Sequence, residues 1–210
     1  MALTRLGGNQ SINLATNTTG TLGVANGGTG LASGTSGQFL KFTGSTTVAS
    51  AAVSAGITQA QCFRLHTNTT GTNTPLQNWE AEDTDGGGSI GSDITVSSGV
   101  FIFPSTGFWL IHFTAEMYYA GDSRQNFAEI QSRTDGSNFD EAAKSSSHSL
   151  VSNTGNSVWN SASCDFIFDV TNTSTHNVRL CTGTTNSSVN IKGDSTSNRT
   201  HVWFVRLGDT

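Results

Sequence analysis

The strongest constraint on the fold is the uneven distribution of aromatic and charged residues along the chain. Residues 1–60 hold only two of the 18 aromatic residues, Phe39 and Phe42, and none of the 15 acidic ones. A stable core needs large apolar side chains to offset the conformational entropy that is lost on folding. We therefore predict two unlike regions: residues 1–60, without a core of their own, and residues 61–210, as one domain of ordinary size.

The overall composition favours β-structure. Of 210 residues, 58 are Ser or Thr, 24 are Gly and 17 are Asn, and these residue types are poor helix formers. The net charge of −5 argues against a nucleic-acid partner. No apolar run approaches the ~20 residues that span a bilayer as a helix. We expect an all-β protein that neither binds nucleic acid nor inserts into a membrane.

In the first region, single apolar residues are separated by Gly, Asn and Thr turns. Two arrangements fit this pattern: a disordered tether, or a thin shaft in which three chains share their few apolar residues. The glycine-rich stretch Ala25–Gly30 is followed by no Lys-Ser or Lys-Thr pair, so it does not predict a phosphate-binding loop.

The residues Gly20–Gly30, followed by Gly37–Phe42, resemble a recurrent motif of tailed-phage appendage proteins, which are tail fibres and related virion decorations. The opening residues, Met1–Leu6, are similar to the N-termini of these proteins. One departure is Gly23, where the family often has proline. The resemblance implies that residues 1–60 attach the chain to other virion proteins as an extended stalk or anchor.

Short strand-like runs separated by Gly, Asn and Ser clusters fill the second region. They predict a sandwich or jelly roll of ten strands. The expected strands are Gln61–His66, Asp93–Ser97, Val100–Phe103, Gly107–Tyr119, Asn126–Arg133, Ala142–Ser149, Val158–Val170, Asn177–Thr182, Ser188–Lys192 and Arg199–Leu207.

Two of these strands, Gly107–Tyr119 and Arg199–Leu207, carry apolar residues on both faces. An antiparallel sheet with one solvated face alternates apolar and polar residues. We therefore expect a second subunit to cover the outer face of both strands. The predicted subunit interface consists of Phe108, Leu110, His112, Val202 and Phe204.

The block Phe103–Leu110 resembles the Pro-x-x-Gly-aromatic signature of complement globular-head (TNF-like) domains. Asn126–Gly136 resembles their fourth strand, and Val202–Leu207 resembles their closing aromatic strand. The resemblance implies a ten-stranded jelly roll in a tight three-fold trimer, with one sheet facing the axis.

Catalytic and metal-binding patterns are scarce. The three cysteines show no C-x-x-C spacing, and we expect free, buried thiols. A calcium-binding loop formed by Asp83, Asp85 and Asp93 remains an alternative, although no Glu that could bind the ion with both oxygens follows. No carboxylate pair or Ser-His-Asp pattern identifies an enzyme, and we expect no cofactor.

The sequence thus predicts a non-enzymatic homotrimeric virion appendage, assembled in the bacterial cytoplasm, whose head binds a host-surface glycan or protein. A structural capsid decoration, or head fibre, with weak adhesion is the alternative, and a glycan-degrading enzyme is a further one. In a jelly roll, the loops farthest from the stalk are the usual place for recognition. The expected receptor-binding residues are Tyr119, Asp122, Arg124, Asn153, Asn156, Lys192, Asp194 and Asn198.

Overall fold

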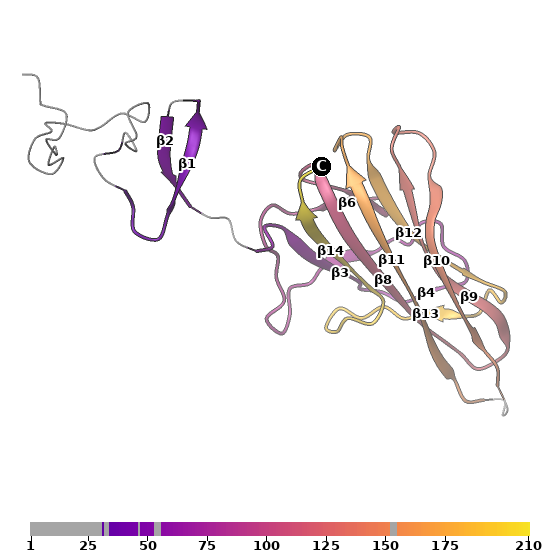
Figure 1. Ribbon diagram of the computed structural model, residues 1–210. Coiled ribbons are helices and arrows are strands. Elements are labelled where there is room, and N and C mark those ends of the chain that lie inside the picture. The colour runs from indigo at the N-terminus through magenta and orange to yellow at the C-terminus, as the bar shows by residue number, and fades with distance from the viewer. Residues whose placement is uncertain (1–30, 32–33, 46, 53–55, 152–154) are drawn as a thin grey trace, which may run out of the picture. The chain divides into compact units, whose positions relative to one another are not determined.

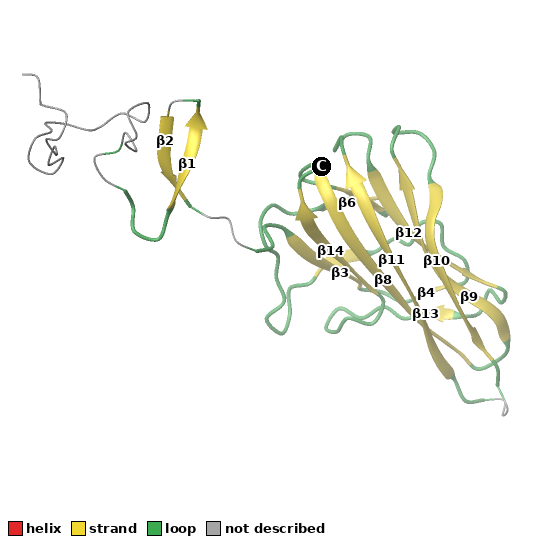
Figure 2. Cartoon of the chain, viewed as in Figure 1, coloured by secondary structure: helices red, strands yellow, loops and turns green. Residues whose placement is uncertain are grey.

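A computed structural model describes residues 31, 34–45, 47–52, 56–151 and 155–210 (Figure 1). These residues form strands, turns and loops, with no helix among them (Figure 2). The described part of the chain accordingly contains no helix long and apolar enough to cross a membrane. The chain separates into two units, Met1–Ala55 and Gly56–Thr210, a division that falls close to the predicted boundary at residue 60.

The described part of the first unit is a two-stranded antiparallel hairpin. Strand β1 (Phe39–Gly44) pairs with β2 (Thr47–Ala51), and a bulge lies next to the turn. This hairpin was not predicted from the sequence. The motif residues Gly20–Gly30 and the opening residues Met1–Leu6 lie outside the described residues.

The second unit, which we call the head, is a sandwich of two antiparallel sheets. The seven-stranded sheet consists of β3 (Ala60–Leu65), β4 (Thr69–Thr70), β5 (Trp79–Ala81), β8 (Gly107–Tyr119), β11 (Val158–Val170), β13 (Asn190–Ile191) and β14 (His201–Gly208). The five-stranded sheet consists of β6 (Thr95–Ser97), β7 (Val100–Ile102), β9 (Ser123–Arg133), β10 (Asp140–Ser149) and β12 (Asn177–Thr184).

The all-β jelly-roll fold predicted from the sequence is confirmed. The ten predicted strands are all present, and two of them, Gly107–Tyr119 and Val158–Val170, have the predicted ends. Two short strands were missed. β4 has two residues and β5 has three, too few to show an alternating pattern.

Aromatic side chains fill the space between the two sheets. Phe101 of β7 is fully buried, and its ring centroid lies 5.0 Å from that of Phe204, 5.3 Å from that of Phe63 and 5.6 Å from that of Trp79. Edge-on and tilted aromatic pairs of this kind stabilise a core beyond their buried area. Phe101 thus joins the five-stranded sheet to β14, β3 and β5 of the other sheet.

The Pro-x-x-Gly block closes the sandwich where the chain enters the head. Gly107 has a φ of +136°, and a Cβ at this position would lie 2.4 Å from the carbonyl oxygen of Gly208. Only glycine fits such a position. Before the glycine, the carbonyl of Ser105 accepts a hydrogen bond from the Trp109 indole (3.3 Å), which fixes this buried ring.

The strand register defines two ends of the head. β14 begins at His201, opposite Arg64 and Thr114, and reaches Ala60 at the start of β3 through Val205. The C-terminus therefore returns to the end at which the chain enters the head, which we call the entry end. The turns after β8 and before β11 and β14 lie at the opposite, distal end, as the predicted topology requires (Figure 1).

Candidate functional site

The outer face of the seven-stranded sheet is the most unusual surface of the head. Even-numbered residues of β8 point outward, because the odd-numbered ones, from Trp109 to Met117, fill the core. In β14 and β11 the odd-numbered residues point outward. The three neighbouring strands β11, β8 and β14 therefore present one continuous outer face.

Two of the five predicted interface residues do not belong to this face. Val202 and Phe204 are fully buried inside the sandwich, where Val202 is opposite Phe113 and Phe204 is opposite Ile111. The prediction is wrong for these two residues because both faces of β14 are apolar, so alternation alone does not tell which face is inside. The outward residues of this strand are His201, Trp203, Val205 and Leu207.

The half of the outer face nearest the entry end is mostly apolar, with Asp169 of β11 opposite Phe108 as the exception. Phe108, Ile167, Trp203 and Leu207 are between 39% and 57% exposed. Leu110, which is half-buried, lies between Ile167 and Val205 in the sheet register. Together they form an apolar stripe across β8, β11 and β14. Monomeric proteins rarely leave such a contiguous patch in water, so the stripe indicates a contact surface.

The middle of the outer face carries a hydroxyl–imidazole–carboxylate chain. His112 Nδ1 lies 2.5 Å from Asp165 Oδ1, and its Nε2 lies 3.1 Å from Thr114 Oγ1, which also bonds Ser163 (2.8 Å). The pattern matches the order of groups in a catalytic triad. In the pairing of β8 with β11, Asp165 is directly opposite His112 and Ser163 is directly opposite Thr114, so these bonds run between paired strand positions. We interpret this row of hydrogen-bonded side chains as a polar network that links β8 and β11.

The distal half of the face is polar and hollowed. An open depression of about 390 Å³ lies between β8, β11 and the start of β14. Its lining includes an exposed indole, an ion pair and an imidazole. The residues concerned are Thr114, Glu116, Trp159, Asn198, Arg199 and His201. The outer face thus divides into an apolar half suited to a protein contact and a concave polar half suited to a ligand.

The described residues among those predicted for receptor binding lie at the distal end, but most of them have structural contacts. The hydroxyl of Tyr119 accepts a hydrogen bond from Asn186 (3.1 Å), and Asp122 Oδ1 accepts one from the backbone of Val151 (2.9 Å). Arg124 is exposed, at the start of β9. These contacts join the turn after β8 to the two neighbouring loops.

Asn156 is exposed before β11, and Asn153 lies outside the described residues. The remaining three predicted residues, Lys192, Asp194 and Asn198, share the loop before β14. Lys192 Nζ lies 3.8 Å from Asp194 Oδ2. Of the seven predicted residues that the structure describes, only Asn198 lines the depression.

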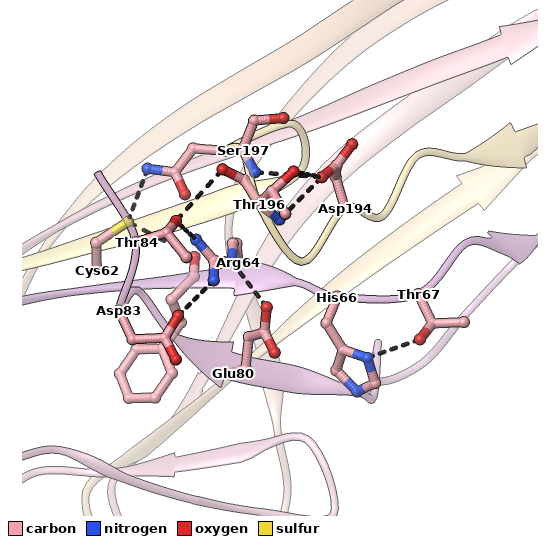
Figure 3. Close-up of polar contacts among 12 residues, drawn as sticks. Cys62, Arg64, His66, Thr67, Glu80, Asp83, Thr84, Asp194, Thr196 and Ser197 are labelled. Atoms are coloured by element: carbon pink, nitrogen blue, oxygen red, sulfur yellow. Dashed lines mark hydrogen bonds and ion pairs between the residues drawn. The ribbon is translucent and has the colours of Figure 1, made fainter. Parts of the chain in front are cut away.

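A buried arginine holds this loop against the loop that follows β5 (Figure 3). The Arg64 side chain is 1% exposed, and it donates hydrogen bonds to Glu80 (2.7 Å), Asp83 (2.6 Å) and Thr84 (2.8 Å). The hydrogen bond to Glu80, together with the charges of both carboxylates, raises the pKa of Arg64. Thr84 in turn donates to the carbonyl of Thr196 (3.3 Å), in the loop before β14.

The same contacts bear on the possible calcium loop. Asp83 is committed to Arg64, and Asp93 accepts a hydrogen bond from Ser89 (2.8 Å). In the part of the chain that the structure describes, no three His, Cys, Asp or Glu side chains are grouped so as to hold a metal ion.

All three cysteines are free and buried, as predicted. Burial raises the pKa of Cys62 and Cys164 to about 12, and that of Cys181 to about 11. Such thiols are protonated at neutral pH and are poor nucleophiles, so they are structural residues.

Four residues of the depression were not predicted from the sequence: Trp159, Glu116, Arg199 and His201. Trp159 had a usable signal, since its odd position in β11 is on the same face as Ser161, Ser163 and Asp165, which marks it as outward. The other three had none, because charged residues at alternate strand positions are normally solvated.

No family model and no curated protein matches the chain. Solved structures do. The structure of Eiger TNF from S. frugiperda is 15% identical, with a TM-score of 0.52 over 74% of this chain and 96% of that one. The crystal structure of murine APRIL at pH 5.0 is 12% identical, with a TM-score of 0.51 over 71% of this chain and 98% of that one. The head therefore has the TNF-like jelly-roll fold.

Proposed function

We propose that the chain is a subunit of a non-enzymatic, homotrimeric virion appendage of a tailed phage. Residues 1–60 attach it to the particle, and the head binds a receptor on the host surface. The observation that carries the proposal is the apolar stripe across β8, β11 and β14. Two further copies of the chain, related by a three-fold axis, would remove this stripe from water.

Three features support this assignment. The head has the fold of a TNF domain, a resemblance that also implied a trimer with one sheet facing its axis. The stripe lies on one sheet only, next to the entry end. The phage motif in Gly20–Gly30 supports attachment to the virion. The hairpin that follows is exposed and has no hydrophobic core that would let it fold as a separate domain.

Light scattering of the full chain tests the trimer. The wild-type protein should have three times the mass of the 22.0 kDa chain. Ile167→Asp places a charge on the stripe at a side chain that is 57% exposed, so it should release monomers without unfolding the head. Ile102→Asp is the matched control, because Ile102 is outward on the other sheet and 38% exposed. A wild-type monomer at micromolar concentration would refute the proposal.

Attachment is tested on particles from infected cells. A chain without residues 1–60 should be absent from purified virions, while the full chain is detected in them by mass spectrometry. Incorporation of the truncated chain would contradict the role of residues 1–60.

A further inference from the structure

Three arginines of the head have no carboxylate partner among the described residues. Five of the eight cationic side chains in the head form ion pairs there: Arg64, Lys144, Lys192, Arg199 and Arg206. The other three are Arg124, Arg133 and Arg179. Arg179 points away from the core, because Val178 and Leu180 on either side of it are fully buried. Its charge therefore lies on the outward side of the five-stranded sheet.

Two of these unpaired arginines are neighbours on that side. In the pairing of β9 with β12, Arg133 is opposite Asn177. Arg179 is opposite Gln131, so the two arginines are diagonal neighbours. Both pack on the ring of Phe139, in the turn before β10, with 4.7 Å from Arg133 Cζ and 4.5 Å from Arg179 Cζ to the ring centroid. One aromatic ring thus holds two like charges near each other.

Neutral acceptors fix both guanidinium groups and leave their charges uncompensated. Arg133 donates from Nε and Nη2 to Asn177 Oδ1 (3.0 and 2.9 Å), and from Nη1 to the carbonyl of Gly136 (3.0 Å). Arg179 donates from Nε to Gln131 Oε1 (2.6 Å), and its Nη1 and Nη2 have no partner among the described residues. The edge of the Arg179 guanidinium formed by Nη1 and Nη2 is therefore held ready for a carboxylate or phosphate, which would also relieve the repulsion between the two arginines.

The surface beside Arg179 carries apolar and hydroxyl groups. Val100 of β7 is opposite Arg179, and Ile102 of the same strand is 38% exposed. Thr95 and Ser97 of β6 lie next along the sheet and are exposed. Neither β6 nor β7 contains a charged residue. A ligand anchored at Arg179 thus meets apolar contacts for C–H groups and hydroxyls for hydrogen bonds, a mixture that suits a sugar ring.

The acidic residues of this sheet limit the site to a single anionic group. Glu129 forms an ion pair with Lys144 (2.8 Å), so it does not neutralise the arginines directly. Asp135 and Asp140 line a small depression with Arg133 at the turn before β10. Their charges disfavour a second anion on that side. The site therefore suits one carboxylate or phosphate and not a polyanion, in agreement with the net charge of −5.

We propose that Arg179, supported by Arg133, binds the carboxylate or phosphate group of an acidic saccharide. The site stays open in the proposed trimer, because the trimer covers the outer face of the seven-stranded sheet and these residues lie on the opposite side of the sandwich (Figure 1). The inference rests on the proposed receptor-binding function and identifies its ligand class. It also moves the site from the distal loop tips to the side of the head, where three copies would let weak sites act together.

Saturation-transfer NMR on the full chain at low ionic strength tests the proposal. The probes are methyl glucuronide, which carries a carboxylate, glucose 6-phosphate, and methyl glucoside as the neutral comparison. Transfer to the ring C–H protons of at least one acidic probe is expected, and the probe that binds identifies the anionic group. Arg179→Gln should weaken that binding about tenfold, the size expected for one lost contact to a charged group. Arg179→Lys, which keeps the charge and loses the paired donors, should give an intermediate affinity.

Arg124→Gln is the matched control, because Arg124 is the third unpaired arginine, lies exposed at the start of β9 and changes the net charge equally. It should leave binding unchanged. No transfer to either acidic probe, or equal binding of methyl glucoside, would overturn the inference. Equal losses in Arg124→Gln and Arg179→Gln would assign the binding to net charge and overturn it too. Tighter binding of N-acetylaspartate than of both acidic saccharides would do the same, in favour of an acidic peptide.

These outcomes separate the inference from the proposed function. A trimer that binds neither acidic probe keeps the appendage and loses the saccharide site. A monomer that binds an acidic probe through Arg179 keeps the site and loses the trimer.

Discussion

The N-terminal hairpin and the head use the same antiparallel pairing, yet they differ in what their side chains contact. In β1, Phe39, Leu40 and Phe42 are 56–68% exposed, although Phe39 and Leu40 point to opposite faces. In β8, every second residue from Trp109 to Met117 is fully buried. Strand pairing satisfies the backbone in both cases, but only a second sheet removes side chains from water. The difference locates the stability of the chain in the head.

Removing one phenyl ring from each unit should give the largest difference in the free energy of unfolding between the head and the hairpin. Phe101→Ala deletes the ring that joins the two sheets and should lower the free energy of unfolding by about 3–5 kcal/mol. Phe42→Ala removes an exposed ring from the hairpin and should change it by less than about 0.5 kcal/mol. Urea unfolding followed by tryptophan fluorescence measures both. Equal losses would show that the hairpin contributes to the same cooperative unit.

A second comparison replaces one cationic residue in each unit, and it should give a smaller difference in the free energy of unfolding. Arg64→Ala removes the donor shared by Glu80, Asp83 and Thr84 and leaves a gap behind β3, so a loss of about 2–4 kcal/mol is expected. Lys41→Ala, on an exposed position of β1, should be close to neutral.

The Arg64 variant should also free the loop before β14 from the loop after β5. In this variant, amide exchange around Thr84 and Thr196 should be faster than in the wild-type protein. Exchange in the β9–β12 ladder should change less. Unchanged exchange at these two residues would mean that other contacts hold the loops together.

Sequence reasoning located the strands of the head because turn residues and apolar alternation are local signals. It assigned β8 correctly, since Trp109, Ile111 and Phe113 alternate with a face that becomes polar at His112. It failed at β14, where both faces are apolar and the register with β8 decides which one is inside. That register depends on pairing between residues nearly 100 positions apart, which no local pattern reports.

The depression was unpredictable for the same reason. Glu116, Trp159 and Arg199 come from three strands or loops that meet only through the sheet order. Arg64 gave no sign of burial either, because a charged residue in an otherwise apolar strand is usually solvated. Of its partners, Glu80 lies in the missed strand β5 and Asp83 lies just after it.

The reactivity of the cysteine thiols tests the head alone, because no cysteine lies in residues 1–60. At pH 8, an aromatic disulfide reagent should modify the thiols of the folded protein about 100-fold more slowly than those of the unfolded chain. Burial raises their pKa from 9.0 to about 11–12, so the fold favours the protonated form. This stabilisation is complete below pH 9 and is lost as the pH rises toward 11–12. Rapid modification of all three thiols in native buffer would contradict the buried positions.

The smallest effect concerns Asp194, and it too belongs to the head, since residues 1–60 contain no carboxylate side chain. Hydrogen bonds from the backbone and hydroxyl of Thr196 lower the pKa of Asp194 from 3.8 to about 2. A lowered pKa means that the ionised form stabilises the loop before β14. That contribution is complete above pH 3.8 and is lost as the pH falls toward 2. Asp194→Asn should therefore flatten the pH dependence of stability in this window, by a small amount because the side chain is solvated. An NMR titration of the Asp194 carboxyl group with its midpoint near pH 3.8 would show that the hydrogen bonds from Thr196 do not stabilise the ionised carboxylate.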